Sequence, residues 1–326
     1  MYDATISFPI LGENFKLNPT RYFEIGNFKF YWYGLIIAIG LTLAVIYALR
    51  SRNRFGLTED NILDMLICAV PSAIVCARIY YVVFNYDLYR GNFLDVFKIW
   101  NGGIAIYGAV IGGMLAVVIF CKIKKISIGA MLDVGALGLL IGQAIGRWAN
   151  FINREAYGAS TNLPWKMGLT SGTKTIYVHP TFLYESLWNI IGFIILHHIS
   201  KKHRKFDGQI FAMYIAWYGF GRFFIEGLRV DSLYLFGTGL RVSQILAIIT
   251  FGIAVIFLLY MFMKRENRPE DLYMNRKAAG DNQAGADLQS DEEETAEEDE
   301  DGEEYEYIDI EEEMEEEAAE KDDKQE

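Results

Sequence analysis

Residues 99–121, IWNGGIAIYGAVIGGMLAVVIFC, contain no Asp, Glu, Lys or Arg. A bilayer core of about 30 Å needs roughly 20 apolar residues in helical form. This segment is therefore predicted to cross a membrane. Residues 30–49 and 242–263 are equally free of these charges. We expect an all-α polytopic membrane protein.

Four further apolar segments are interrupted by a charge: residues 62–84, 129–147, 180–200 and 208–227. Together with the first three, they predict seven transmembrane helices. The first helix begins too far from the N-terminus, and is too poorly flanked, to be a cleaved signal peptide.

Clusters of Lys and Arg predict the orientation of the helices. They lie in residues 50–54, 122–125 and 201–205, and in residues 264–268 after the last helix. Along a seven-helix path these four clusters fall on one face, which is expected to be cytoplasmic. The N-terminus is then outside and the C-terminus inside. A small extracytoplasmic head is expected between helices four and five, at about residues 148–178.

The net charge of −12 hides two opposite parts. Residues 281–326 have a net charge of −23, whereas residues 1–280 have a net charge of +11. A segment so rich in like charge and so poor in apolar residues cannot bury enough surface to fold. We expect a membrane domain over 1–268 and a disordered, acidic cytoplasmic tail over 269–326. Three cysteines in 326 residues exclude a disulfide scaffold.

Glycines spaced by four are expected at helix contacts. Gly108 and Gly112 form one such set, and Gly138, Gly142 and Gly146 form another. Small residues on one face let two transmembrane helices approach closely. A groove for lipid beside these helices would have the same pattern.

Ionisable residues inside the predicted helices indicate a functional site, because they are costly in lipid. Arg78, Arg147 and Arg222 lie on three helices that run in the same direction, and the helical rise places all three in the outer half of the membrane. A guanidinium binds two phosphate oxygens at once. We expect these arginines to meet and to bind an anionic phospholipid. The alternative is that they reach individually to the headgroups.

Other polar residues are expected at the same rim. Tyr218 and Glu226 share a helix face with Arg222, and Arg229 follows at the helix end. Polar residues also gather in three segments: 102–112, which contains Tyr107; 146–158, which contains Asn150, Asn153, Glu155 and Gly158; and 179–185, which begins with His179.

Residues 146–158, GRWANFINREAYG, match the pattern G-R-x-x-N-F-x-N-x-E-x-x-G. On this run the sequence resembles the phosphatidylglycerol–prolipoprotein diacylglyceryl transferase family of bacterial membrane enzymes. Shorter runs add support: WYG at 32–34, AR at 77–78, the glycine-rich segment 102–113, HPTFLYE at 179–185 and YGFGRFFIEGLR at 218–229. The resemblance covers about residues 5–265.

The resemblance implies a transferase of the bacterial cytoplasmic membrane, with its active site facing the outer leaflet. The diacylglyceryl group of phosphatidylglycerol would move to the lipobox cysteine thiol of a preprolipoprotein, whose signal peptide is recognised. A thioether forms and glycerol phosphate leaves, in the first step of lipoprotein maturation. No cofactor or metal and no nucleic-acid partner is expected, since no CxxC, HExxH, P-loop or dinucleotide motif occurs.

Residue by residue, the resemblance implies that Arg147 binds phosphatidylglycerol and that Arg222 is a second essential cation. Further substrate-binding residues that it implies are Arg78, Asn150, Asn153, Gly158, Tyr33, Tyr218 and Arg229. For several of these an alternative stays open: Tyr33 could anchor the helix at the interface, and Asn150 and Asn153 could tie down a loop.

The general base is left open. Some relatives have a histidine, proposed as the base, where this chain has Tyr107. A phenol with a pKa near 10 is a poor base at neutral pH. His179, Glu155 and Glu226 are the other candidates, although His179 could cap a helix and Glu226 could hold Arg222. A cationic field could also lower the pKa of the thiol enough without any base.

Three other functions are alternatives to the transferase. A phospholipid transporter often shows internal repeats, and none is evident. An intramembrane hydrolase needs a nucleophile with a base in reach, and no G-x-S-x-G occurs. A lipid-binding membrane scaffold would release no product.

Overall fold

The computed structural model describes residues 4–279 except 13, 92, 236–238 and 265–268. The chain divides into two compact units, Met1–Lys277 and Ala278–Glu326, and the first unit alone is described below. Residues 269–277 belong to the first unit. The predicted acidic tail falls, from residue 280 on, outside the described residues.

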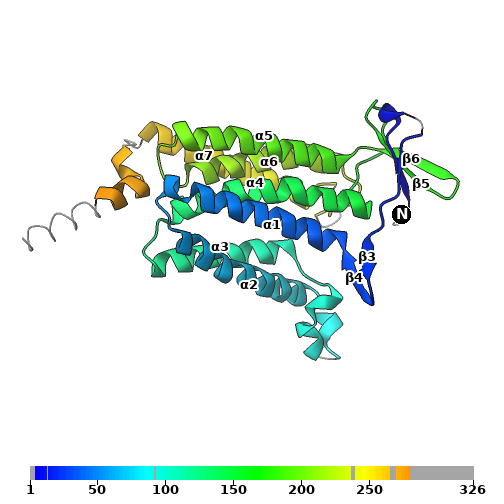
Figure 1. The fold of residues 1–326 in the computed structure, drawn as a ribbon, viewed down its shortest axis with the longest axis horizontal. Helices are drawn as coiled ribbons and strands as arrows, with labels where there is room; N and C mark the ends of the chain where they lie inside the picture. Colours follow the sequence, from blue (N-terminus) through cyan, green and yellow to red (C-terminus); the bar gives the residue numbers. More distant parts are fainter. Residues whose placement is uncertain (1–3, 13, 92, 236–238, 265–268, 280–326) are drawn as a thin grey trace, which may run out of the picture. The chain divides into compact units, whose positions relative to one another are not determined.

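Among the described residues of this unit, seven long helices form its body (Figure 1). They are α1 (Trp32–Ser51), α2 (Glu59–Phe84), α3 (Ile106–Ile123), α4 (Ile128–Asn153), α5 (Thr181–Lys202), α6 (Gln209–Leu228) and α7 (Val242–Lys264). Six segments in the described part of the chain are long and apolar enough to cross a membrane, and α6 is not among them. The fold is therefore that of a helical membrane protein with six candidate spans.

Two helix boundaries differ from those predicted. The segment that starts at residue 99 becomes α-helical only at Ile106, because Gly102 and Gly103 take positive φ values of +84° and +78°. In the other direction, α4 continues past residue 147 to Asn153. Asn150 and Asn153 therefore lie on a helix and not in a loop.

The glycine spacing corresponds to real helix contacts, of unequal closeness. On α3, a Cβ added at Gly112 would lie 2.6 Å from the Cys76 Cβ of α2. On α4, which packs against α1, Gly146 leaves more room, and an added Cβ would lie 3.3 Å from the Ile37 side chain. The first pair is in close contact, whereas the second pair meets more loosely.

Two small antiparallel sheets lie outside the all-α expectation. One has the order β2-β1-β5-β6, from β1 (Thr5–Ser7), β2 (Lys16–Leu17), β5 (Met167–Ser171) and β6 (Lys174–Val178). The other is the hairpin of β3 (Tyr22–Ile25) and β4 (Phe28–Tyr31). The head between α4 and α5 is thus completed by the N-terminal segment, and Figure 1 shows it beyond the ends of these helices. Buried Arg154 joins the two parts by donating to the carbonyls of Ala4 and Pro19.

Short 3-10 helices complete the described chain: η1 (Pro9–Leu11), η2 (Arg52–Phe55), η3 (Tyr86–Tyr89), η4 (Phe93–Phe97), η5 (Ile99–Asn101) and η6 (Pro269–Asp271).

A polar network lies at the end of the helices opposite the head, and we call it the capping network. Fully buried Asp133 of α4 accepts hydrogen bonds from the backbone N–H groups of Gly208 and Phe211, at the start of α6. Asp207 accepts from Ser127 Oγ and pairs with Arg204. Asp207 also accepts from the backbone N–H of Tyr273, which begins a helical segment. This contact holds the segment after α7 against the loops.

Candidate active site

Three arginines converge on the carboxylate of Glu185, which is 6% exposed. Arg147 Nη2 lies 2.7 Å from Oε2, Arg222 Nη1 lies 3.3 Å from Oε1, and Arg229 Nη1 lies 3.7 Å from Oε1. The three arginines come from the last turns of α4, the last turns of α6 and the residue after α6, whereas Glu185 comes from the start of α5. We call these four residues, together with Glu226, the arginine cluster.

Glu226 is the second buried carboxylate of the cluster, with 2% exposure. Its Oε2 lies 2.6 Å from Arg222 Nη2 and 3.9 Å from Arg229 Nε. Arg241 also donates to the backbone carbonyl of Glu226. Glu226 lies four residues after Arg222 on the same helix face, and it thus orients the guanidinium of Arg222.

Arg229 is held from the outside by Asp231. Its Nε and Nη2 donate to the two carboxylate oxygens at 2.9 and 2.7 Å, which is the bidentate geometry favoured by a guanidinium. The hydrogen bond from Arg229 keeps the pKa of Asp231 below its ordinary value. Asp231 is half exposed, so its charge is screened more than that of Glu185 or Glu226.

A tryptophan pair sets the register of α5 against α6 close to the cluster. The rings of Trp188 and Trp217 stack with centroids 4.2 Å apart. Each indole N–H donates to the backbone carbonyl of the other tryptophan, at 3.1 and 3.0 Å. Gly192 and Gly221 leave room for the two rings. Trp188 lies about one turn from Glu185, so the pair holds Glu185 at the level of Arg222.

The signature segment adds a polar chain that ends on Arg147. Arg147 Nη1 donates to Asn150 Oδ1 at 3.4 Å, and Asn150 Nδ2 donates to Glu155 Oε1 at 2.8 Å. The backbone N–H of Glu155 donates to the carbonyl of Asn150 at 3.0 Å. Asn150 therefore lies between the arginine and Glu155, and fixes both.

Gly158 brings the chain after α4 next to the start of α5 and the end of α6. It forms an antiparallel bridge with Arg229, and its N–H donates to the carbonyl of His179 at 3.0 Å. A Cβ at Gly158 would lie 2.6 Å from the His179 Cβ, so only glycine allows this approach. His179 Nδ1 is 3.2 Å from the Tyr184 hydroxyl. The structure thus brings His179 beside the backbone of the cluster, and its side chain contacts Tyr184.

Arg78 is placed differently from the expectation. The arginine that joins Arg147 and Arg222 is Arg229, and the contacts of the described residues do not link Arg78 to the cluster. Its guanidinium donates instead to backbone carbonyls of the segment that precedes α3: those of Asp95, Val96, Lys98, Gly102 and Gly103. In this structure Arg78 organises that segment.

The remaining predicted residues lie on four helices, α1, α3, α4 and α6, and outside the described contacts of the cluster. Tyr107 is the second residue of α3, with its ring centroid 6.3 Å from that of Tyr80. Tyr33 is exposed near the start of α1, and Asn153 is the last residue of α4. Tyr218 packs beside Tyr214 on α6. A role for these residues in binding stays a prediction.

Glu185 is the central residue that the sequence did not single out. It ends the run HPTFLYE and is a carboxylate at the start of an otherwise apolar helix. That combination is the same signal of a costly buried charge that marks the arginines. What the sequence lacks is any indication that three separate helix ends meet at this residue.

The cluster is suited to an anion. Three guanidinium groups face two buried carboxylates, and a guanidinium carries more N–H donors than a carboxylate can accept. Donors that converge from three helices are fixed in place before a ligand arrives, which lowers the ordering cost of binding. A phosphate is a suitable ligand for such a set.

Comparison with known proteins points to one family. Residues 20–260 match the family model described as prolipoprotein diacylglyceryl transferase. A phosphatidylglycerol–prolipoprotein diacylglyceryl transferase of Listeria innocua is 46% identical over 249 residues, which are 74% of this chain and 89% of the relative. An enzyme of that name from Clostridioides difficile is 44% identical over 245 residues, 75% of this chain and 96% of the relative.

Proposed function

The chain belongs to the prolipoprotein diacylglyceryl transferase family, and from this premise we propose that the arginine cluster is its phospholipid phosphate site. The chain is a transferase of lipoprotein maturation that moves the diacylglyceryl group of phosphatidylglycerol to prolipoproteins. The observation that carries the proposal for the site is the convergence of Arg147, Arg222 and Arg229 on buried Glu185.

For the membrane topology we propose seven spans, with α6 as the sixth. Although α6 carries Arg222 and Glu226, these charges pair with each other and with their neighbours inside the bundle. The basic loops at residues 50–54, 122–125 and 201–205 would face the cytoplasm. The arginine cluster, at the other end of these helices, would then face the outer leaflet of the bacterial cytoplasmic membrane.

The reaction that we propose for the lipobox cysteine is a substitution at carbon. The thiolate sulfur attacks the glycerol carbon that bears the phosphodiester, a C–S bond forms, and the C–O bond to phosphate breaks. The electron pair leaves with glycerol phosphate. Arg147 and Arg222 would bind the phosphate more tightly as its negative charge grows, and this lowers the barrier.

The two buried glutamates would act by positioning. Glu185 holds the three guanidinium groups together, and Glu226 orients Arg222 and Arg229. Because Glu226 is engaged by arginines, the structure favours this role over that of general base. Glu155, held by Asn150, and His179, beside Tyr184, stay candidates for the base, together with Tyr107. The cationic field of the cluster would assist in forming the thiolate.

The test is transfer by purified Arg147→Ala and Arg222→Ala variants. The substrates are phosphatidylglycerol and a lipobox peptide, and the products are glycerol phosphate and a thioether-linked lipid. Each variant should lose transfer while still inserting into the membrane. Arg90→Ala is the matched control, since Arg90 is an exposed arginine on the chain between α2 and α3. Near-normal transfer by either cluster variant would disprove the proposed site.

A further inference from the structure

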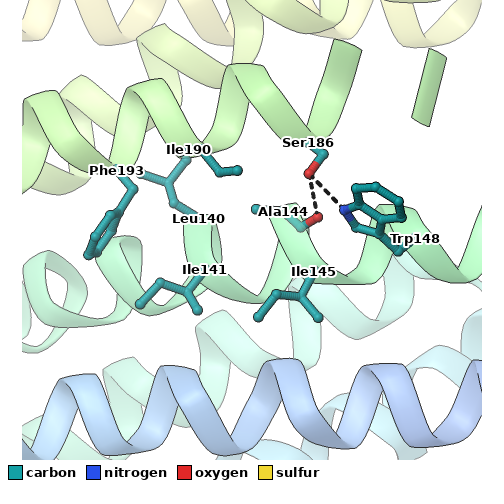
Figure 2. Close-up of a pocket in the computed structure, with 8 residues that line it drawn as sticks. All are labelled: Leu140, Ile141, Ala144, Ile145, Trp148, Ser186, Ile190 and Phe193. Carbon is teal, nitrogen blue, oxygen red and sulfur yellow. Dashed lines mark hydrogen bonds between the residues drawn. The ribbon is translucent and has the colours of Figure 1, made fainter. Parts of the chain in front are cut away.

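An apolar groove runs along α4 and α5, and two residues at one end of it directly follow residues of the arginine cluster in the chain. Its volume is about 230 Å³. Figure 2 shows its lining: Leu140, Ile141, Ala144, Ile145 and Trp148 from α4, and Ser186, Ile190 and Phe193 from α5. The few polar groups lie at the end where Trp148 and Ser186 meet. The rest of the groove is lined by hydrocarbon side chains.

The polar end of the groove is next to the arginine cluster in the chain. Trp148 follows Arg147 in the chain, and Ser186 follows Glu185. The Trp148 indole donates to Ser186 Oγ at 3.3 Å, and the Ser186 hydroxyl donates to the carbonyl of Ala144 at 2.8 Å (Figure 2). These two hydrogen bonds satisfy the polar atoms that line this end. A molecule held by the cluster could therefore continue directly into an apolar environment.

The other end of the groove is closed by aromatic packing. The ring of Phe193 contacts Tyr47 of α1 edge-on, with centroids 5.1 Å apart. The Tyr47 hydroxyl is in turn 2.6 Å from His197 Nδ1. The groove thus has a defined length as well as a defined position.

We propose that this groove binds one acyl chain of phosphatidylglycerol while the arginine cluster holds its phosphate. The proposal rests on the proposed function and specifies where the lipid lies. Leu140 and Trp148 are eight positions apart on α4, which corresponds to about 12 Å of helix. One leaflet contributes about 15 Å of a bilayer core of about 30 Å. The groove therefore matches the depth of a single chain in one leaflet.

The small volume of the groove argues against the apolar helix of a signal peptide as its occupant. A helix with side chains is about 10–12 Å across and needs about 30 Å to span the core. A space of about 230 Å³ does not hold such a helix. Ile190 and Trp148 are 43% and 45% exposed, so a flexible chain can enter sideways from the bilayer.

The experiment uses phosphatidylglycerol that carries a photoreactive diazirine within one acyl chain. The full chain, in bilayer nanodiscs, is irradiated and the adducts are mapped by mass spectrometry. Adducts are expected within residues 140–148 and 186–193, and excess phosphatidylglycerol should compete with them. In Ile190→Trp, which fills the groove mouth, these adducts should fall at least about tenfold.

Ile191→Trp is the matched control. Ile191 is the next residue of α5, has a similar exposure of 47%, and does not line the groove. Transfer gives a second readout. Ile190→Trp should lower kcat/KM for long-chain phosphatidylglycerol by about tenfold or more, because a misplacement of about 1 Å can cost on the order of 100-fold. Its kcat/KM for a dihexanoyl lipid should change little.

The proposal would be overturned by adducts that map mainly to other helices, or by equal effects of the two tryptophan variants. Equal labelling by a diazirine phosphatidylcholine would also overturn it, because the groove would then bind lipid independently of the cluster. Failure of the proposed function looks different, since Arg147→Ala or Arg222→Ala would then keep near-normal transfer even if the groove is labelled.

Discussion

The two ends of the helix bundle both bury carboxylates, but they satisfy them in different ways. In the capping network, Asp133 accepts from the fixed backbone N–H groups of Gly208 and Phe211. In the arginine cluster, Glu185 is held by three side chains from separate helix ends. Backbone donors cannot be released without unfolding the start of α6, whereas guanidinium groups can exchange one anion for another. We infer that the first end determines stability and the second end binds substrate.

An arginine-to-lysine substitution made at each end should give the largest difference in transfer rate between the two ends. Arg222→Lys keeps the charge but loses the planar fork, and transfer should fall by about 100- to 1000-fold, as for loss of one transition-state donor. Arg204→Lys should leave kcat of the folded protein nearly unchanged. It should lower the thermal midpoint instead, because Arg204 pairs with Asp207 and lies over the Phe55 ring.

These two lysine variants are compared by initial transfer rates per folded protein and by thermal unfolding in detergent. The distinction between the two ends would break down if Arg204→Lys lost transfer as severely as Arg222→Lys.

A second comparison uses glycines that allow close approach at each end. In Gly158→Ala, the new Cβ would lie 2.6 Å from the His179 Cβ, and the shift should reach Arg229 through the backbone bridge. We expect transfer to fall by about tenfold or more. In Gly129→Ala, the Cβ would lie 2.6 Å from the Asp207 carbonyl carbon. That variant should lose about 1–3 kcal/mol of stability through overpacking and keep its kcat.

The glycine variants are measured in the same two assays, with Gly252→Ala as the control, since a Cβ at Gly252 meets nothing within 4 Å. An unchanged kcat in Gly158→Ala would show that the bridge does not position the cluster.

The smallest expected effect concerns Asp231, at the exposed edge of the cluster. Its folded pKa is lowered by the hydrogen bond from Arg229, so its contribution to stability is present above its unfolded pKa, near 3.9, and is lost as the pH falls through the folded pKa. Because Asp231 is half exposed, we expect about 0.5 kcal/mol or less. Asp231→Asn should be slightly less stable than wild type at pH 7.

Thermal unfolding of Asp231→Asn and wild type is compared between pH 7 and pH 3. The difference in thermal stability between the two proteins should narrow as the pH falls toward 3. A gap that widens as the pH falls would contradict the assigned direction of the pKa shift.

Much of the fold could be predicted because its signals are local. Continuous apolar segments predicted helices that the structure contains, and the run GRWANFINREAYG predicted the family that the comparisons establish. The arginines at 147 and 222 could also be singled out, because a charge inside an apolar helix is costly wherever its partner lies. Each of these inferences needs only residues that are close together in the chain.

Tertiary structure decided which residues meet. The pairing of β1 with β5 and the position of Glu185 join segments that are far apart in the sequence. Arg78, like Arg147, is a charged residue inside an apolar helix. Its guanidinium, however, is occupied by the backbone of residues 95–103. A composition rule gives the cost of burying a charge, and only the packing of the helices determines which partner offsets it. The sequence by itself thus determined the class, the family and the charged residues, and the fold determined that three arginines share one glutamate.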